Sequence, residues 1–471
     1  MARRTDRGGR ATSHREGRSK SSPDSRAGSP HSRSGRGDPP RAEPESATEH
    51  PDGPPGRSGP PVLSPSGTVV VAVAAATIAV LPVFLTGALT VQIRPGLQVT
   101  TGDIGIAIAS FFGASAICSA TFGALAERAG SMVLMRIAAG VSLVALCGVA
   151  LFAHHLWSLA TFLAVGGVGN GAMQPAVNQL LTRAVRRERQ GLAFGVKQAA
   201  IPASTLLSGL AVPVLALTFG WRAAFLVAGA LALAVLVGIS VLGSRLRGTT
   251  PAPIHRQGPR GATDGSSLSG LFARPLLVLA AAMAMAVAAS NAMGAFVVPS
   301  AVAHGVAPGL AGLLAALGSI TGLTARVTLG WRADTSPNHG LVAAHRHLRT
   351  VSVLLALGVL GYLALASGSL ALLVPGTLLA FGAGWGYNGL FNLAVVRAYP
   401  SSPARATGIT QVGTYIGGMV GPLGFGLLVD HQGYDLAWVL CGAVAAAGAG
   451  VFVIGRRYLA RSTVAASAPG I

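Results

Sequence analysis

Long apolar runs separated by short polar stretches fill most of this 471-residue chain. About 20 apolar residues are enough for a helix to cross the ~30 Å hydrocarbon core of a bilayer. Twelve such runs follow residue 66, and each predicts a transmembrane helix: roughly 68–91, 103–125, 132–153, 156–181, 191–216, 222–244, 275–299, 308–330, 349–367, 370–396, 407–429 and 435–455. The pattern therefore predicts an all-α membrane protein with twelve transmembrane helices.

The polar stretch 245–274 divides the runs six and six. Residues 1–66 are rich in Arg, Ser, Pro and Gly, a composition typical of disordered segments. We expect a disordered basic tail over 1–66, a six-helix bundle over 67–244, a cytoplasmic central loop over 245–274, a second six-helix bundle over 275–458 and a short C-terminal tail over 459–471. No signal peptide is expected, since the first apolar run begins only after the tail.

The charge distribution explains why the chain is basic. Its formal net charge is +20, although 51% of its residues are hydrophobic and only 11% are charged. Nineteen arginines outside the tail fall on one side of the predicted helices, whereas only Arg94 and Arg222 fall on the other. Arginine-rich loops are typical of the cytoplasmic side, so we expect both termini in the cytoplasm and no nucleic-acid partner. The Arg, Ala and Gly bias is typical of a GC-rich genome. We expect a bacterial inner-membrane protein that is a monomer in the lipid bilayer.

The two groups of runs also repeat short motifs. Parallel repeats of this kind, in which both halves cross the membrane in the same orientation, imply two bundles related by an axis along the membrane normal. A binding site is expected between the two bundles. The repeated positions are Gly195-Val-Lys-Gln198 with Gly408-Ile-Thr-Gln411 at a spacing of 213, and Asn170 with Asn388 and Gln174 with Asn392 at a spacing of 218.

Two loop motifs stand at equivalent places in the halves. They are Gly123-Ala-Leu-Ala-Glu127-Arg128-Ala-Gly130, with Arg136 beyond it, and Gly330-Trp-Arg332-Ala-Asp334. Together with the "FGWRAAF" stretch at 219–225, they resemble signatures of the major facilitator superfamily over about residues 68–458. The resemblance implies alternating access, with Glu127, Arg128, Arg136, Arg332 and Asp334 as charge pairs that close an inner gate. Helix-end charges that only support topology are the alternative.

The eighth run allows a finer comparison. Its "LTARVTLGWRAD" stretch resembles the monocarboxylate and oxalate/formate branches of that superfamily. The resemblance places the chain near these branches and near the cyanate-type anion porters. In these branches an arginine at the position of Arg326 is associated with a substrate carboxylate. The fourth run carries Gly167 and Gly169 without the preceding arginine of many proton-driven drug exporters, which argues against that mechanism.

Charged residues inside the runs point to the substrate. All seven acidic residues outside the tail lie in loops or at run ends, whereas Lys197 and Arg326 lie inside runs. Intramembrane charges are costly and mark transport pathways, and two cations without a carboxylate favour an anionic solute. Snorkelling of both long side chains to the membrane surface is the alternative. Without an intramembrane acid, uniport or anion exchange is favoured over carboxylate-relayed symport.

Polar side chains recur every four residues in two equivalent runs, and this spacing places them on one helix face. We predict that they line a central cavity, with interhelical packing as the alternative. They are Asn170, Gln174 and Asn178 in the fourth run and Asn388 and Asn392 in the tenth, with Tyr387 beside them.

These observations favour a carrier of a small organic or inorganic anion. The alternatives are a proton-driven multidrug exporter of the same superfamily and a non-transporting membrane sensor. No nucleophile–base pair, phosphate-binding loop or metal-ligand spacing appears, and the three cysteines lie in apolar runs. We therefore expect no enzyme activity, no metal and no cofactor.

Overall fold

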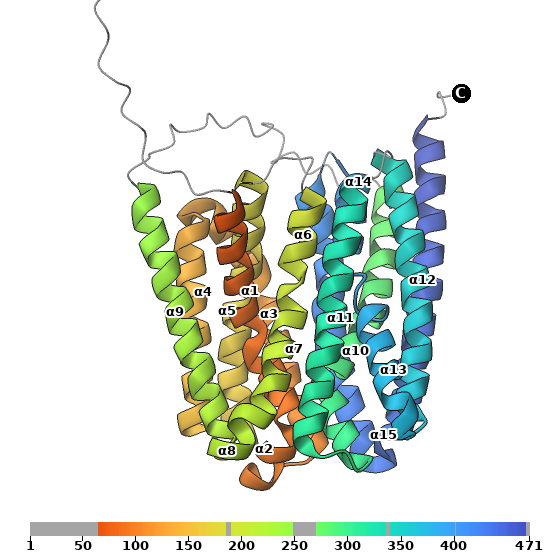
Figure 1. The fold of residues 1–471 in the computed structure, drawn as a ribbon. Helices are drawn as coiled ribbons and strands as arrows, with labels where there is room; N and C mark the ends of the chain where they lie inside the picture. Colours follow the sequence, from red (N-terminus) through yellow and green to blue (C-terminus); the bar gives the residue numbers. More distant parts are fainter. Residues whose placement is uncertain (1–64, 185–189, 248–269, 336–339, 401, 468–471) are drawn as a thin grey trace, which may run out of the picture. The chain divides into compact units, whose positions relative to one another are not determined.

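The computed structural model describes residues 65–184, 190–247, 270–335, 340–400 and 402–467. Every regular element within these ranges is a helix (Figure 1). The helices are α1 (Pro65–Ala88), α2 (Thr90–Leu97), α3 (Thr101–Ala129), α4 (Ser131–Phe152), α5 (Leu156–Ala184), α6 (Gln190–Gln198), α7 (Ala200–Ala211), a π-helical turn (Val212–Ala216), α8 (Leu217–Phe219), α9 (Trp221–Arg247), α10 (Gly270–Ala303), α11 (Pro308–Asp334), α12 (Gly340–Ala366), α13 (Leu370–Gly382), α14 (Asn388–Ala398) and α15 (Pro403–Ser467). The predicted basic tail lies outside these residues, apart from its last two positions.

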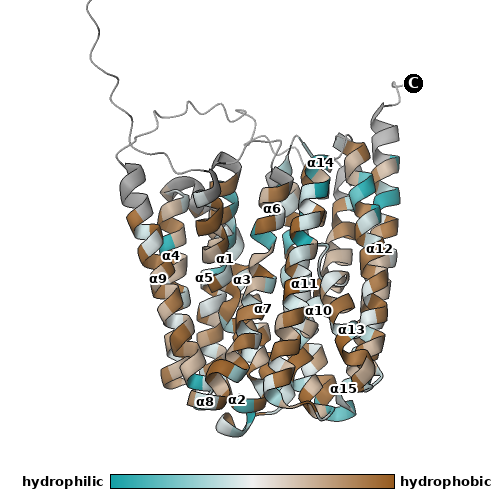
Figure 2. Cartoon of the chain, in the orientation of Figure 1, coloured by the Kyte–Doolittle hydropathy of each residue, from teal (hydrophilic) through white to brown (hydrophobic). Residues whose placement is uncertain are grey.

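Within the described ranges, ten helical stretches are long and apolar enough to cross a membrane. Apolar residues dominate most of their length (Figure 2). One of these stretches, within α15, contains Gly433 in a non-helical conformation (φ 81°, ψ 177°). Residues 416–428 before this glycine and 437–444 after it line the same groove, so the chain turns back on itself there. The protein is thus a multi-pass membrane protein.

Two expected helices are interrupted, and proline or glycine accompanies each interruption. The fifth predicted helix is divided into α6 and α7 at Ala199, three residues before Pro202. Because proline has no N–H, Pro202 cannot donate to the carbonyl of Gln198, four residues earlier. The tenth is divided into α13 and α14 by residues 383–387, which include Gly384 and Gly386. At both interruptions, between α6 and α7 and between α13 and α14, backbone carbonyls are available to accept hydrogen bonds from side chains.

Small residues allow the helices to approach closely. Gly413, Gly417 and Gly421 form a stripe on α15, and a Cβ at any of them overlaps a carbonyl oxygen of α10. Close contact of this kind is how helices associate within a bilayer, where burial of apolar surface gives little driving force. α10 and α15 are accordingly in extensive contact.

A second close contact joins the region of α6 and α7 to α11. The two short helices lie end to end beside α11 (Figure 1). A Cβ at Gly195 stands 2.8 Å from the carbonyl oxygen of Arg326, and one at Gly209 stands 2.6 Å from that of Gly312. This backbone-to-backbone packing places the interruption at Ala199 directly against α11.

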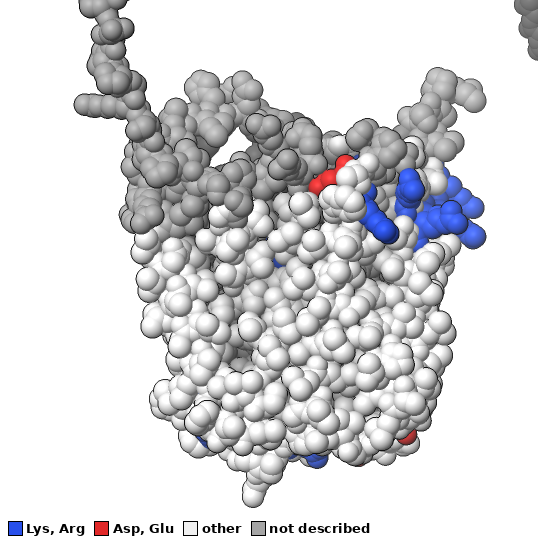
Figure 3. All heavy atoms as spheres, viewed as in Figure 1, with Lys and Arg blue, Asp and Glu red and all other residues white. Residues whose placement is uncertain are grey.

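On the visible face of the molecule (Figure 3), charged side chains lie near the ends of the helices. In Figure 3 the central part of the visible face is almost free of Lys, Arg, Asp and Glu, and basic side chains gather near the ends of α12 and α15. Arg346 and Arg349 belong to α12, and Arg456, Arg457 and Arg461 belong to α15. This separation is the one that a bilayer imposes on a spanning protein.

Candidate functional site: two buried cations at interrupted helices

Lys197 and Arg326 are both buried. Lys197 is the penultimate residue of α6 and is 6% exposed, and Arg326, in α11, is 1% exposed. A charge removed from water at such positions is costly unless polar partners surround it. Both side chains are enclosed by the protein rather than exposed along the outside of a helix.

Arg326 is held by backbone carbonyls. Its Nε and Nη2 donate to the carbonyl oxygen of Trp385 at 3.2 and 2.9 Å, and its Nη1 donates to the carbonyl oxygen of Gln198. The guanidinium also lies 5.3 Å from the centre of the Trp385 ring, within cation–π range. Both carbonyls come from the interrupted helices: Gln198 ends α6, and Trp385 lies between α13 and α14. Arg326 therefore joins α11 to two other parts of the chain.

Lys197 is held by side chains instead. Its Nζ donates to Gln174 Oε1 at 2.6 Å. Gln174 Nε2 donates to Asn170 Oδ1 at 3.1 Å, and Asn170 Nδ2 donates to Ser115 Oγ at 3.1 Å. Asn170 and Gln174 thus share one face of α5, as their spacing predicts. The bonds link three helices through polar side chains.

Every described partner of the two cations is a neutral oxygen. Four acidic side chains are described, and each has a partner at a helix end: Asp103 accepts from the N–H of Thr100, Asp334 from that of Leu192, Asp430 from those of Thr101 and Gly102, and Asp435 pairs with His304. Arg326 also lies close in space to the backbone beside Lys197, since it binds the carbonyl of Gln198, the next residue. We call Lys197, Arg326 and their described partners the cationic centre; none of these partners is a carboxylate.

The other predicted substrate-binding residues fall in different surroundings. Tyr387 and Asn388 are buried just after Trp385, and Asn392 is half-buried one turn further along α14. The Tyr387 hydroxyl has no hydrogen bond of normal geometry to the described residues. Asn178 is exposed on α5. Tyr387 and Asn388 thus follow the segment whose Trp385 carbonyl binds Arg326, whereas Asn170 and Gln174 are hydrogen-bonded in series to Lys197.

The predicted gating residues are described only in part. The side chains of Glu127 and Arg128 and the surroundings of Gly123 lie outside the described residues. Gly130 precedes α4 with φ of 85°, Gly330 packs against Gly195, and Arg332 is exposed. Arg136 is half-buried and donates from Nη2 to the Ser240 carbonyl at 3.3 Å.

Asp334 makes a contact that the sequence did not indicate. Its Oδ2 accepts a hydrogen bond of 2.7 Å from the N–H of Leu192, in the first turn of α6. The first N–H groups of a helix have no partner within it, and a carboxylate there also meets the positive end of the helix dipole. Asp430 does the same for α3, with bonds of 3.0 and 2.7 Å to the N–H groups of Thr101 and Gly102. Each carboxylate joins a helix before the central stretch 245–274 to one after it.

Sequence reasoning missed Trp385, Gln198 and Ser115. Trp385 and Gln198 act through their carbonyls, which no side-chain pattern marks. Pro202 is a usable signal for Gln198, because a proline predicts a free carbonyl four residues earlier. Ser115 carries no comparable signal, because serines are common in membrane helices.

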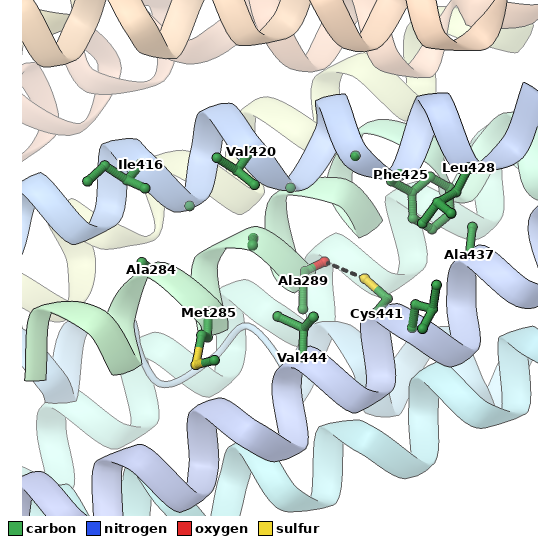
Figure 4. Close-up of a pocket in the computed structure, with 15 residues that line it drawn as sticks. Ala284, Met285, Ala289, Ile416, Val420, Phe425, Leu428, Ala437, Cys441 and Val444 are labelled. Atoms are coloured by element: carbon green, nitrogen blue, oxygen red, sulfur yellow. Dashed lines mark hydrogen bonds between the residues drawn. The ribbon is translucent and has the colours of Figure 1, made fainter. Parts of the chain in front are cut away.

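Two hollows lie outside this centre. One, of about 310 Å³, is an apolar groove between α10 and the two arms of α15, lined by residues such as Met285, Val420 and Cys441 (Figure 4). The other, of about 420 Å³, lies among α2, the end of α10 and Tyr434, and includes Arg94. Neither of these two hollows is lined by Lys197 or Arg326.

The sequence matches the Major Facilitator Superfamily over residues 64–422, which is most of the chain. The chain belongs to this superfamily. It is also 28% identical to monocarboxylate transporter 11 of Homo sapiens over 275 residues, a match that covers 56% of this chain and 56% of the human protein. The chain thus spans just over half the length of that relative. The superfamily indicates transport of a small solute rather than an enzyme reaction.

Proposed function

We propose that this transporter carries a small anion by alternating access, and that Lys197 and Arg326 bind it. The observation that carries the proposal is the burial of two cations whose described partners are all neutral oxygens. A buried charge with only neutral partners remains uncompensated, and an anion is the partner that offsets its desolvation. The monocarboxylate transporter among its relatives supports a carboxylate as the solute class.

The contacts of Arg326 suggest how the anion couples to movement. Its guanidinium bonds the carbonyls of Gln198 and Trp385, so a carboxylate that takes up its planar fork replaces these carbonyls. Exchange of the Gln198 contact loosens α6 from α11. Anion binding then shifts the equilibrium between conformations through a contact made in one and lost in the other.

The same proposal includes the wider arrangement. Twelve spans follow if α13 and α14 together form one span and Gly433 divides α15 into two. The spans form six-helix bundles over 67–244 and 275–458, which rock about the cations while Asp334 and its neighbours close one end. We place the protein in the bacterial inner membrane as a monomer, with both termini in the cytoplasm. Uniport or anion exchange is the transport mode, since no described carboxylate adjoins the cations.

Counterflow in proteoliposomes tests the proposal. The full chain is reconstituted, and uptake of labelled lactate, oxalate, formate, cyanate and nitrate is compared with uptake of a cationic amphiphile. We expect uptake of at least one anion, and Lys197→Gln reduces it by about 100-fold, as expected for loss of a charged contact of about 3 kcal/mol. Arg94→Gln, which removes an exposed arginine of α2, is the matched control and retains uptake.

Two results contradict the proposal. One is anion uptake by Lys197→Gln equal to that of the unchanged protein. The other is uptake of the cationic amphiphile, driven by a proton gradient, with no uptake of any anion; this result establishes the multidrug exporter instead.

A further inference from the structure

Ser115 stands at the start of the polar chain that ends at Lys197. It lies on α3, is fully buried, and donates its hydroxyl hydrogen toward the carbonyl oxygen of Gly167 on α5 at 2.9 Å. The same hydroxyl oxygen accepts from Asn170 Nδ2, and the chain continues through Gln174 to the Lys197 ammonium. Three consecutive side-chain bonds thus connect α3 to α6 through α5.

The direction of every bond in this chain is fixed from both ends. An ammonium group can only donate, so Gln174 must present its oxygen to Lys197 and its NH₂ group to Asn170. Asn170 must then present its own oxygen to Gln174 and its NH₂ group to Ser115. At the other end the two carbonyls within reach of the Ser115 hydroxyl, those of Phe111 and Gly167, can only accept. The Ser115 hydrogen is therefore used on a carbonyl, and the Ser115 oxygen remains for Asn170. The two requirements agree, and no amide in the chain can turn over without breaking two bonds.

This arrangement orients Lys197 without neutralising it. A carboxylate in the place of Gln174 also accepts a hydrogen from Nζ, but its charge cancels that of the ammonium. The Gln174 amide contributes only a dipole, so one ammonium hydrogen is committed while the positive charge and two further hydrogens stay available. Such a series of hydrogen bonds suits a lysine that must keep its position and bind an anion.

We propose that Ser115 is a positioning residue that, through Asn170 and Gln174, holds the Lys197 ammonium in place to receive the anion. The inference rests on the proposed anion-binding role of Lys197. It adds that the binding strength depends on a hydroxyl two helices away that does not itself touch the solute. Removal of this hydroxyl takes away one of the two bonds that hold the Asn170 amide, so Asn170, and through it Gln174 and Lys197, are held less firmly.

Ser110 provides a matched control on the same pair of helices. Its hydroxyl donates to the carbonyl oxygens of Ala107 on α3 and Ala160 on α5, at 2.7 and 2.8 Å. Ser115 bonds the carbonyls of Phe111 on α3 and Gly167 on α5, both at 2.9 Å. The two serines therefore make similar hydrogen bonds between α3 and α5, although Ser115 is fully buried and Ser110 half-buried. They differ in that Ser115 also accepts the bond from Asn170.

The test compares Ser115→Ala with Ser110→Ala in proteoliposome counterflow of the transported anion, together with the melting temperature of each full-length variant. We expect both substitutions to lower the melting temperature, Ser115→Ala somewhat more because it also leaves the Asn170 NH₂ group without this acceptor. Ser115→Ala raises the KM for the anion about five-fold with Vmax retained, as expected for a bond of about 1 kcal/mol, whereas Ser110→Ala leaves KM unchanged. In a Lys197→Gln background, Ser115→Ala produces no further change, because the residue through which it acts is absent.

A second variant tests the chain if Ser115→Ala does not fold. Gln174→Glu keeps the acceptor for Nζ and adds the charge that cancels the ammonium, so anion uptake falls as far as in Lys197→Gln. Equal KM values for the two serine variants, or wild-type uptake by Gln174→Glu, overturn the positioning role. Wild-type uptake by Lys197→Gln instead overturns the proposed function, so the two failures are distinguishable.

Discussion

Arg222 and Arg326 make nearly the same contacts at two places in the molecule. The Nη1 and Nη2 atoms of Arg222 donate to the carbonyl oxygens of Ala150 and Ala153, each at 2.7 Å, and its guanidinium lies 4.4 Å from the centre of the Trp221 ring. Arg326 likewise bonds two carbonyls and lies beside a tryptophan. Both use the planar fork of arginine to satisfy backbone oxygens that no helix satisfies.

The difference is where the carbonyls come from. Ala150 and Ala153 lie at the end of one helix, α4, where the last carbonyls always lack helical partners. Gln198 and Trp385 come from two interruptions far apart in the sequence. Arg222 therefore joins the start of α9 to the end of α4, whereas Arg326 joins α11 and the Trp385 segment to α6. On the proposed alternating access, the contact between Arg326 and α6 breaks and re-forms, whereas the contacts of Arg222 stay fixed.

Removal of each guanidinium is expected to produce the largest difference between the two arginines. Arg222→Gln leaves buried carbonyls unsatisfied and lowers the free energy of unfolding by about 1–3 kcal/mol, with anion uptake per folded molecule retained. Arg326→Gln also lowers stability, and it reduces anion uptake by at least about 100-fold because charge and joint are lost together. Melting temperature and counterflow of the reconstituted variants measure the two effects. An equal loss of uptake in both variants shows that Arg326 is only structural.

Replacement by lysine separates charge from geometry. A lysine ammonium is a point charge and does not reproduce the fork that reaches two carbonyls at once. We expect Arg326→Lys to reduce uptake about tenfold, a smaller loss than with Arg326→Gln, because the charge remains. Arg222→Lys keeps uptake unchanged. Full uptake by Arg326→Lys shows that charge alone is sufficient and that the carbonyl contacts have no part in transport.

The sequence predicted the parts of this arrangement that depend on side-chain chemistry. Lys197 and Arg326 stood out because they are charges inside apolar runs, and both are buried. Asn170 and Gln174 were predicted to share a helix face, and their side chains are hydrogen-bonded. The helix interruptions were not predicted, because apolar residues continue through them and periodicity does not change. Their carbonyls, including that of Trp385, therefore became visible only in the fold.

The repeat shows the limit of sequence comparison most clearly. The spacing of 213 residues equates Lys197 with Thr410 and Gly195 with Gly408. Thr410 is as buried as Lys197, but its hydroxyl bonds only the local carbonyl of Thr407, at 3.1 Å. The halves share a helix pattern, yet the packing around equivalent positions differs. A repeat predicts where helices lie, and the contacts across them determine what each residue does.

The equivalent glycines Gly195 and Gly408 also differ in their surroundings, and their substitution gives the smallest expected effect. A Cβ at Gly195 stands 2.8 Å from the Arg326 carbonyl oxygen and 3.3 Å from the Gly330 Cα, and these backbone atoms cannot move aside as a flexible side chain does. Gly195→Ala therefore pushes α6 from α11, with an expected stability cost of about 1–3 kcal/mol and about a threefold fall in anion uptake.

Gly408→Ala is the matched substitution, because nothing lies within 4 Å of a Cβ at Gly408. Alanine favours a helix over glycine by about 0.5–1 kcal/mol, so the melting temperature of this variant stays equal or rises, and uptake is unchanged. The opposite signs of the two stability changes, measured by thermal unfolding in one detergent, test whether α6 rests directly on the backbone around Arg326. A stability gain in both variants means that α6 and α11 are further apart, and that Arg326 reaches Gln198 across a gap rather than through a close joint.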